Sequence, residues 1–354
     1  MPFRNLKLLI ILNKALGTLS CKLVNSRLKS SSTWNRYFCM AWFLFHCLNA
    51  SVYYYNINVA TPETDKIGLA LANLRFGTHT ASLLPYPFAA AFWSEHFVKL
   101  SEKLEMYDEQ AITLGHPRKD KHVFIYLFFI YTFVASGCTA YYDIREGIAK
   151  GFMGILKVMQ DTVPVISGTY CVFITCIFLD LIRQRFRHLN ETIIPRVSKL
   201  PVTGSQGEIT VYTVRQLHGV LLDGAKLINA LYGIGGLFTC LFLLLQYLMV
   251  IYIFVIDLKE NLDMEDNVVD TLNLLFQTIY FAAMYHFTTY EVNRVEDRVI
   301  KYGLPFSSKK CRMDKIEMML YFYHRRYFFT AAQFFQLDVT IFLPVRQVYP
   351  LYRY

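Results

Sequence analysis

Long apolar segments alternate with polar segments along the whole chain. A helix needs roughly 20 mostly apolar residues to cross about 30 Å of hydrocarbon. By this criterion the sequence predicts six transmembrane helices, of which the second is the most interrupted, since it contains Arg75, His79, Pro85 and Pro87. The predicted spans are Phe38–Val59, Leu69–Trp93, His122–Tyr142, Val163–Ile182, Leu231–Ile256 and Val268–Tyr290.

The composition agrees with this pattern. Hydrophobic residues make up 54% of the 354 residues, charged residues make up 18%, and the mean hydropathy is +0.30. These values indicate an all-α membrane protein rather than a soluble domain. The net charge is +9, but the basic residues lie between the apolar runs, so we expect the lipid bilayer and not nucleic acid as the partner.

The basic residues also predict the orientation. Residues 1–37 contain seven Lys and Arg, no Asp or Glu, and no cleavage pattern of a signal peptide, which is typical of a cytoplasmic tail. The polar segments on that side of the six spans hold 28 Lys and Arg, against five on the other side. Because basic residues are retained in the cytoplasm, we expect a cytoplasmic N-terminus. This excludes a G-protein-coupled receptor, whose N-terminus is outside.

Apolar stripes continue out of three predicted spans. Residues with helical spacing follow the fourth span as far as Pro195 and precede the fifth span from Val211. An unbroken helix from Val211 to Ile256 would be roughly 70 Å long. Similar stripes follow the sixth span and occupy the segment that contains Ile316, Met319, Tyr323 and Tyr327. We therefore expect helices four to six to extend into a cytoplasmic bundle, either shared between subunits or formed within one chain.

Three segments carry a resemblance to a known family. They are residues 178–190, residues 217–229 followed by Tyr232 and Gly233, and residues 330–338. Their order and spacing resemble those of insect gustatory receptors, within the insect chemoreceptor superfamily. The resemblance implies a tetrameric, ligand-gated, non-selective cation channel of seven-helix subunits. Its implied location is the plasma membrane of chemosensory neurons, and its implied ligand is a small tastant molecule bound in the outer half of the helix bundle.

The resemblance also implies residues that hold the subunits together. In the family, inner extensions of helices four to seven form an anchor domain. The matching positions in this sequence are Arg185, Leu189, Asn190, Leu217, Leu221, Phe334, Phe335, Leu337 and Asp338.

Polar and aromatic side chains at membrane depth are the candidates for ligand contact, because they are costly unless they face a cavity or a partner. They are Tyr141, Tyr142, Thr169, Tyr170, Gln246, Tyr247, Tyr252, Gln277 and Tyr280. The alternative is that the tyrosines form interfacial belts and the glutamines bond to neighbouring helices. Arg75 and His79 are expected either to meet a ligand or to pair with a carboxylate on another helix. We interpret Tyr53–Tyr55 as an aromatic belt outside the pocket.

The sequence gives little support for an enzyme, a metal site or a cofactor site. The chain contains no HExxH, Walker or GxSxG motif, and its eight cysteines form no CxxC pair. We therefore expect no enzyme activity, no metal and no cofactor, and we interpret Asp180 and Arg183 as a local ion pair. The acidic segment 257–270 is either a cation-attracting pore mouth or a solvated loop. A secondary transporter remains the alternative function, although only the second span has the interruptions that such proteins repeat in both halves.

The C-terminal residues determine whether a seventh helix can cross the membrane. Residues 291–342 are expected to form cytoplasmic anchor helices, the last of them the inner half of a truncated seventh helix. Residues 343–354 contain two prolines and two arginines and are too short and polar to cross a bilayer. The sequence therefore predicts six transmembrane helices, with the pore-lining half of a seventh absent.

Overall fold

The computed structural model describes most of the chain. The described residues are 6–25, 27–30, 32–60, 66–119, 123–149, 151–196, 209–260, 265–302, 316–317 and 319–337. Side chains at some helical positions next to the gaps are also outside this description.

The described residues are mostly helical, as the sequence predicts. The helices are α1 (Lys7–Ala15), α2 (Thr33–Ala60), α3 (Lys66–Leu83), α4 (Pro85–Phe92), α5 (Ser94–Thr113), α6 (Val123–Ala149), α7 (Gly151–His188), α8 (Val211–Glu260) and α9 (Glu265–Tyr302). A π-helical turn and a 3₁₀ turn, Leu189–Ile193 and Ile194–Arg196, continue α7 to the expected end near Pro195. Residues 316–317 and 319–323 are also helical. There are two small antiparallel hairpins in the described part, one of β1 (Lys22–Val24) and β2 (Arg27–Lys29), and one of β3 (Thr330–Ala331) and β4 (Phe335–Gln336).

Each predicted span falls on helical residues, but the second one is broken. It is divided into α3 and α4 just before Pro85, which lacks the N–H group that a continuous helix requires. Two helical stretches of the described chain are long and apolar enough to cross a membrane, Thr162–Arg196 and Tyr212–Tyr252, and a shorter apolar helix covers Ile125–Gly137.

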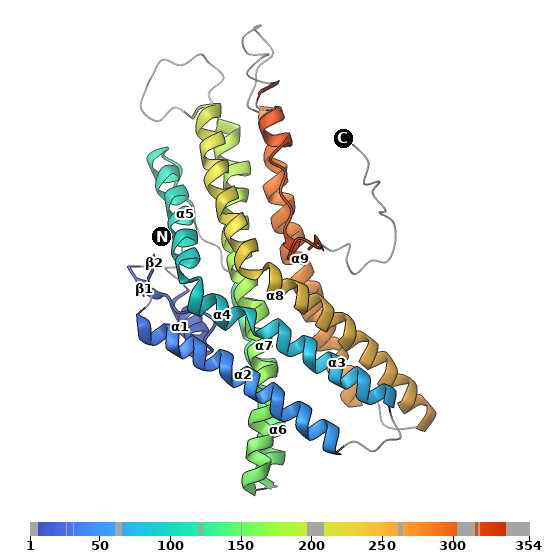
Figure 1. Ribbon diagram of the computed structural model, residues 1–354. Helices are drawn as coiled ribbons and strands as arrows, with labels where there is room; N and C mark the ends of the chain where they lie inside the picture. The colour runs from blue at the N-terminus through green and yellow to red at the C-terminus, as the bar shows by residue number, and fades with distance from the viewer. Residues whose placement is uncertain are drawn as a thin grey trace.

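The helices pack as one bundle at one end and diverge toward the other (Figure 1). Helix α8 runs unbroken for 50 residues, about 75 Å at 1.5 Å per residue, which confirms the long helix predicted from Val211. Helix α3 packs along α8, α6 packs along α7, and α7 also packs against α9. The bundled end contains α5, the end of α7 and the start of α8.

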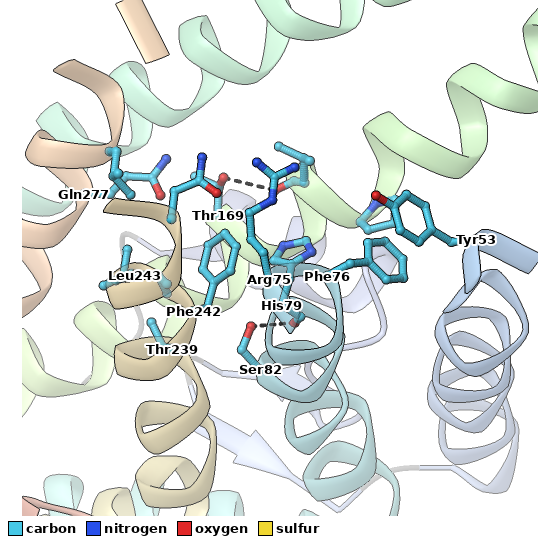
Figure 2. A pocket seen from close by; sticks show the side chains of 16 residues that line it. Tyr53, Arg75, Phe76, His79, Ser82, Thr169, Thr239, Phe242, Leu243 and Gln277 are labelled. Carbon is cyan, nitrogen blue, oxygen red and sulfur yellow. Dashed lines mark hydrogen bonds between the residues drawn. The ribbon is translucent and has the colours of Figure 1, made fainter. Parts of the chain in front are cut away.

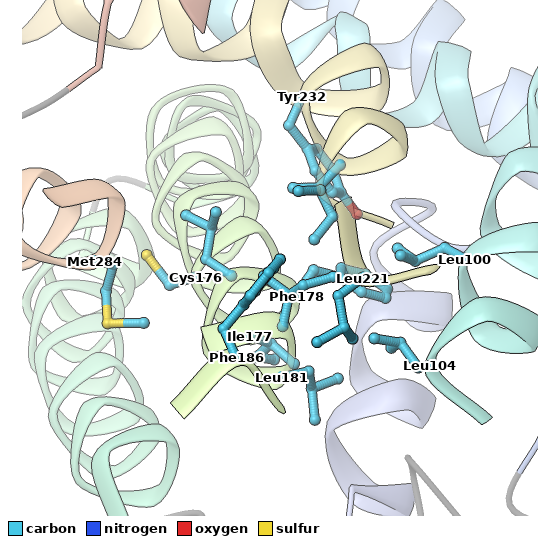
Figure 3. Close-up of a cluster of buried hydrophobic side chains, with 14 of the residues drawn as sticks. Leu100, Leu104, Cys176, Ile177, Phe178, Leu181, Phe186, Leu221, Tyr232 and Met284 are labelled. Atoms are coloured by element: carbon cyan, nitrogen blue, oxygen red, sulfur yellow. The ribbon is translucent and has the colours of Figure 1, made fainter. Parts of the chain in front are cut away.

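Buried apolar side chains fill the bundled end. The predicted stripes of α7 and α8 lie in this core, where Phe186, Leu189, Leu217 and Leu221 are each 0% exposed. Figure 3 shows side chains of α5, α7, α8 and α9 meeting there. The bundle is therefore formed within one chain at these positions.

The N-terminal segment also has structure that the sequence pattern did not predict. Leu9 and Ile10 of α1 are buried in the same core. In β2, the backbone N–H of Leu28 donates to Ser101 Oγ of α5 at 3.1 Å. Residues 6–30 are thus packed on the bundle.

The expected helix at residues 330–337 is wrong. Phe334, Phe335 and Leu337 belong to the β3–β4 hairpin, whose turn places Ala332 and Gln333 at positive φ (49° and 69°). The reason is a tertiary contact with α8. Asn229 of α8 accepts a hydrogen bond from Thr330 N (2.8 Å) and donates one to Thr330 Oγ1 (3.1 Å).

A second asparagine and a glycine complete the docking of this hairpin. Asn293 of α9 donates to Tyr327 O and accepts from Tyr327 N, both at 2.9 Å. A Cβ at Gly233 would lie 3.1 Å from the carbonyl oxygen of Thr330. The segment therefore obtains its hydrogen bonds from α8 and α9, which a helix would have made internally.

A buried ion pair joins α5 to α7. The Arg185 side chain is fully buried, and Arg185 Nη2 lies 2.6 Å from Asp108 Oδ2. Arg185 also donates to the carbonyl oxygens of Leu104 and Leu181, and Arg118 Nε lies 3.3 Å from Asp108 Oδ1. Burial alone raises the pKa of the Asp108 carboxyl, but the charges of Arg185 and Arg118 outweigh burial and hold this pKa below its usual value. Asp108 is therefore ionised at neutral pH.

Removing this carboxylate is expected to destabilise the bundle strongly. We expect Asp108→Asn to lower the free energy of unfolding by about 3–5 kcal/mol, because Arg185 would remain buried without a counter-charge. The measurement is thermal unfolding of the purified protein in detergent. The matched control is Asp223→Asn, which breaks the exposed Lys103–Asp223 pair and is expected to cost about 1 kcal/mol or less. Equal unfolding temperatures for the two variants would contradict this assignment.

Candidate functional site

A cavity of about 500 Å³ lies between α2, α3, α7, α8 and α9. Figure 2 shows the side chains that line it. They are Tyr53, Arg75, Phe76, His79, Ser82, Pro164, Val165, Gly168, Thr169, Val172, Thr239, Phe242, Leu243, Gln246, Leu274 and Gln277. This volume is within the range of sites for small organic molecules, and the mixture of apolar walls with a few polar groups is typical of such sites.

Helix α3 contributes the charged and aromatic wall. Arg75, Phe76, His79 and Ser82 follow one another at spacings that place them on one side of the helix. The ring of Phe76 stacks on Tyr53 of α2, with centroids 3.6 Å apart, and the Ser82 hydroxyl donates to the backbone oxygen of His79. The interrupted second span therefore supplies a continuous wall of the cavity.

Helix α7 contributes an irregular wall. Pro164 lies inside this helix and cannot donate to the carbonyl oxygen of Gln160. That oxygen instead accepts a hydrogen bond from Asn49 Nδ2 of α2 at 2.8 Å. One turn later, a Cβ at Gly168 would lie only 2.8 Å from His79 Nε2. Glycine at this position therefore allows the imidazole to lie directly against α7.

Helices α8 and α9 close the remaining sides. Thr239, Phe242, Leu243 and Gln246 lie on one face of α8, and Leu274 and Gln277 come from α9. The Phe242 ring lies 4.7 Å from the His79 ring, between centroids. The imidazole of His79 is thus held between α7 and α8.

The charge of the cavity is positive. Its lining residues include Arg75 but no Asp or Glu. Among the described side chains, none forms the expected alternative, an ion pair of Arg75 with a carboxylate of another helix. Within the described part of the chain, no carboxylate lies within ion-pair distance of this guanidinium.

Three predicted ligand-binding residues line the cavity. These are Thr169, Gln246 and Gln277. The others lie elsewhere. Tyr141 is 61% exposed, Tyr170 is buried in the core, and Tyr280 stacks on Phe128 with centroids 3.9 Å apart. Tyr247 and Tyr252 are half-buried on α8 outside the lining, and the side chain of Tyr142 is outside the described residues.

Sequence reasoning missed several lining residues. Tyr53 was expected in an aromatic belt, and Phe76, Thr239 and Phe242 were not considered. A signal was present in the spacing, since Thr239, Phe242 and Gln246 recur on one helical face with Leu243. The spacing could not show that this face meets Arg75 and His79 of α3.

The predicted anchor residues divide into two groups. Arg185, Leu189, Leu217 and Leu221 are fully buried within the chain, and buried Asn190 donates to the backbone and the carboxylate of Glu291. On the hairpin, Phe334 is 78% exposed, Phe335 is 36% exposed and Leu337 is buried. Asp338 is outside the described residues.

Two further predictions have different outcomes. The local ion pair between Asp180 and Arg183 is confirmed by hydrogen bonds from the guanidinium to Asp180 Oδ1. The acidic side chains of segment 257–270 lie outside the description, as does the whole of segment 338–354. The predictions about a pore mouth and a missing pore-lining half therefore stay predictions.

Long helices around a cavity of ligand size place this molecule among helical small-molecule-binding proteins. The chain belongs to the 7tm chemosensory receptor family, whose sequence profile matches residues 6–344. The resemblance inferred from the sequence motifs is thereby confirmed at the level of the chemosensory receptors.

Solved structures show the same fold. The chain is similar to the insect olfactory receptor OR5 from Machilis hrabei in complex with eugenol, with a TM-score of 0.66 and 8% identity over 95% of this chain and 93% of that one. A second structure of the same receptor gives a TM-score of 0.64 and 10% identity over the same shares. No curated protein sequence shows significant similarity to the chain.

Narrowing the cavity at Gly168 tests its geometry. We expect Gly168→Val to displace the His79 imidazole and to slow modification of a cysteine placed in the cavity, Gln246→Cys, by a small thiol reagent several-fold. The measurement is the labelling rate above that of the parent protein, whose native cysteines give the background. Gly137→Val is the control, because a Cβ at Gly137 meets nothing within 4 Å. An unchanged rate in Gly168→Val would contradict the described contact.

Proposed function

We propose that this protein is a gustatory-type chemoreceptor, a subunit of a ligand-gated, non-selective cation channel that detects small organic tastants. The observation that carries the proposal is the cavity of about 500 Å³ between five helices. Three of those helices, α7, α8 and α9, also reach the bundled end of the chain (Figure 1). A ligand that changes the spacing of α3 and α8 therefore acts on α8, a helix that extends from the cavity to the bundled end.

The comparison with OR5 supports a ligand of modest size. The OR5 structure contains eugenol, a small organic molecule. The fold is shared, but 8% sequence identity does not allow the ligand of one protein to be assigned to the other. The ligand of this chain is therefore inferred from its own cavity and not from the olfactory receptor.

The exposed surface supports a location in the plasma membrane. Large apolar side chains face outward along α2, α6 and α8, where a soluble protein would carry charges. They include Leu44, Leu48, Leu127, Ile130, Phe133, Leu244 and Ile251, each between 54% and 67% exposed. With the 28 basic residues assigned to one side, this surface supports a bilayer-embedded domain and a cytoplasmic N-terminus.

The exposed hairpin supports assembly into a tetramer with copies of this chain or with other chemoreceptor subunits. Phe334 on the β3–β4 turn is 78% exposed, and Ile316, Met319 and Tyr323 are each 38% to 58% exposed. The buried anchor residues cannot contact another subunit directly. We therefore assign the contact between subunits to this exposed set and the rigidity behind it to Arg185, Leu217 and Leu221.

Current recordings test the function. Cells that express this chain with a second chemoreceptor subunit are expected to give cation currents to at least one compound of a small-molecule panel. Gly168→Val is expected to reduce the response at least about tenfold in sensitivity, equivalent to ~1.4 kcal/mol of binding, while Gly137→Val leaves it unchanged. Recording the chain alone, under the same conditions, shows whether it conducts by itself. Uptake of a compound against its gradient without current would favour a transporter instead.

Assembly is tested separately from ligand response. We expect Phe334→Glu combined with Tyr323→Glu to shift the purified protein from tetramers toward smaller species, because charges would replace exposed apolar contacts. Particle mass in detergent is the measurement. Ile112→Glu on α5, which replaces an apolar residue that is 58% exposed, is the control. Loss of tetramers in the control alone would move the interface to α5.

A further inference from the structure

We propose that the cavity selects small aromatic carboxylates, with the guanidinium of Arg75 as the group that binds the carboxylate. This inference rests on the proposed function, since it names the chemical class of ligand for the same cavity. It goes beyond size and polarity, because it predicts that an acid binds more tightly than the amide or alcohol of the same shape.

The first step is the charge of Arg75. An arginine side chain remains protonated under all relevant conditions. Arg75 lies nine residues after the start of α3, about 14 Å along the helix axis, and is half-buried where it lines the cavity. A charge removed from water is costly unless an opposite charge or several hydrogen bonds compensate it.

The second step is that the described chain offers Arg75 no counter-charge. The lining residues include no carboxylate, and no described carboxylate lies within ion-pair distance of the guanidinium. Arg185 provides the internal comparison, since its guanidinium is fully buried and is matched by Asp108 at 2.6 Å. The chain supplies an anion to the arginine that it buries for packing, whereas none of the described side chains supplies one at the cavity.

The third step is the donor geometry. A guanidinium presents N–H groups in a planar fork that matches the two oxygens of a carboxylate, which gives two parallel charge-assisted hydrogen bonds. Neutral amide side chains of Gln246 and Gln277 line the opposite walls, on α8 and α9. These amides donate to an oxygen atom without competing with Arg75 for an anion.

The fourth step concerns the rest of the ligand. Tyr53 and Phe76 are stacked at 3.6 Å, and Phe242 lies beside His79 at 4.7 Å. Aromatic rings of the wall favour an aromatic ligand through stacked and edge contacts. Figure 2 shows Arg75 beside Phe242 and His79, with Tyr53 and Phe76 farther along the same wall. A ligand whose carboxylate binds Arg75 therefore has aromatic side chains of the wall available for its ring.

The headgroup of an anionic lipid, such as phosphatidylserine, is a second source of oxyanion at membrane depth. It would reach Arg75 from the bilayer and would not require the aromatic walls. The experiment therefore varies the lipid charge and the ligand charge independently.

The test uses three compounds of nearly one shape, 3-phenylpropanoate, 3-phenylpropanamide and 3-phenylpropanol. The full chain is reconstituted in nanodiscs of phosphatidylcholine, with and without phosphatidylserine. Binding is measured by protection of Gln246→Cys from thiol modification and by thermal stabilisation of the parent protein. We expect the acid to bind at least about tenfold tighter than the amide and the alcohol, in both lipid compositions.

Two variants assign this preference to Arg75. In Arg75→Gln the affinity for the acid is expected to fall at least about tenfold, while affinity for the amide changes less than about twofold. Arg75→Lys is expected to retain part of the preference, because it keeps the charge but not the fork. If Arg75→Gln does not fold, the ratio of acid to amide affinity in the parent and in Arg75→Lys decides the question.

The outcomes separate this inference from the proposed function. Equal or tighter binding of the amide or alcohol, with ligand-evoked current intact, overturns the inference and leaves the function in place. Stabilisation by phosphatidylserine through Arg75, without effect of the acid, also overturns it in favour of a lipid. No protection of Gln246→Cys by any compound of the current-recording panel, together with no current, overturns the proposed function itself.

Discussion

The neutralisation of one buried arginine is the constraint on which the bundled end depends. Arg185 is among the largest fully buried side chains of the described chain, and its charge is met by Asp108 from α5 and by two backbone oxygens. Burial of a guanidinium without these partners costs several kcal/mol, so α5 has to lie against α7 at this point. The apolar stripes of α7 and α8 can then close around one core, and α8 can extend from that core to the cavity as a single helix.

The same requirement for polar partners organises the irregular parts of the fold. Pro164 leaves the carbonyl oxygen of Gln160 without its helical partner, and Asn49 supplies one from α2. Asn229 does likewise for the backbone of Thr330. Buried backbone groups are out of reach of water, so each of these two irregularities is matched by a side chain from another element.

The cavity occupies the region where the apolar pattern is weakest. Arg75 and His79 interrupt the second predicted span, and Gly168 of α7 allows His79 to approach. Such residues weaken a helix as a membrane span, but together they produce a polar space of ligand size. The contrast with Arg185 explains why we propose an anionic ligand. Arg185 is paired with the Asp108 carboxylate, whereas Arg75 lines the cavity.

Local sequence patterns determined the helices, the long rod from Val211, the buried stripes that contain Leu189 and Leu217, and the ion pair of Asp180 with Arg183. Each depends on residues a few positions apart, and helical spacing fixes their relation. Thr169, Gln246 and Gln277, which line the cavity, were predicted as ligand contacts from their depth within a span. The tertiary structure decided which helix faces enclose the cavity, and it folded residues 330–337 as a hairpin. Those outcomes depend on contacts such as Asn229 with Thr330 and Gly168 with His79, between residues that are far apart in the chain and whose meeting no local pattern encodes.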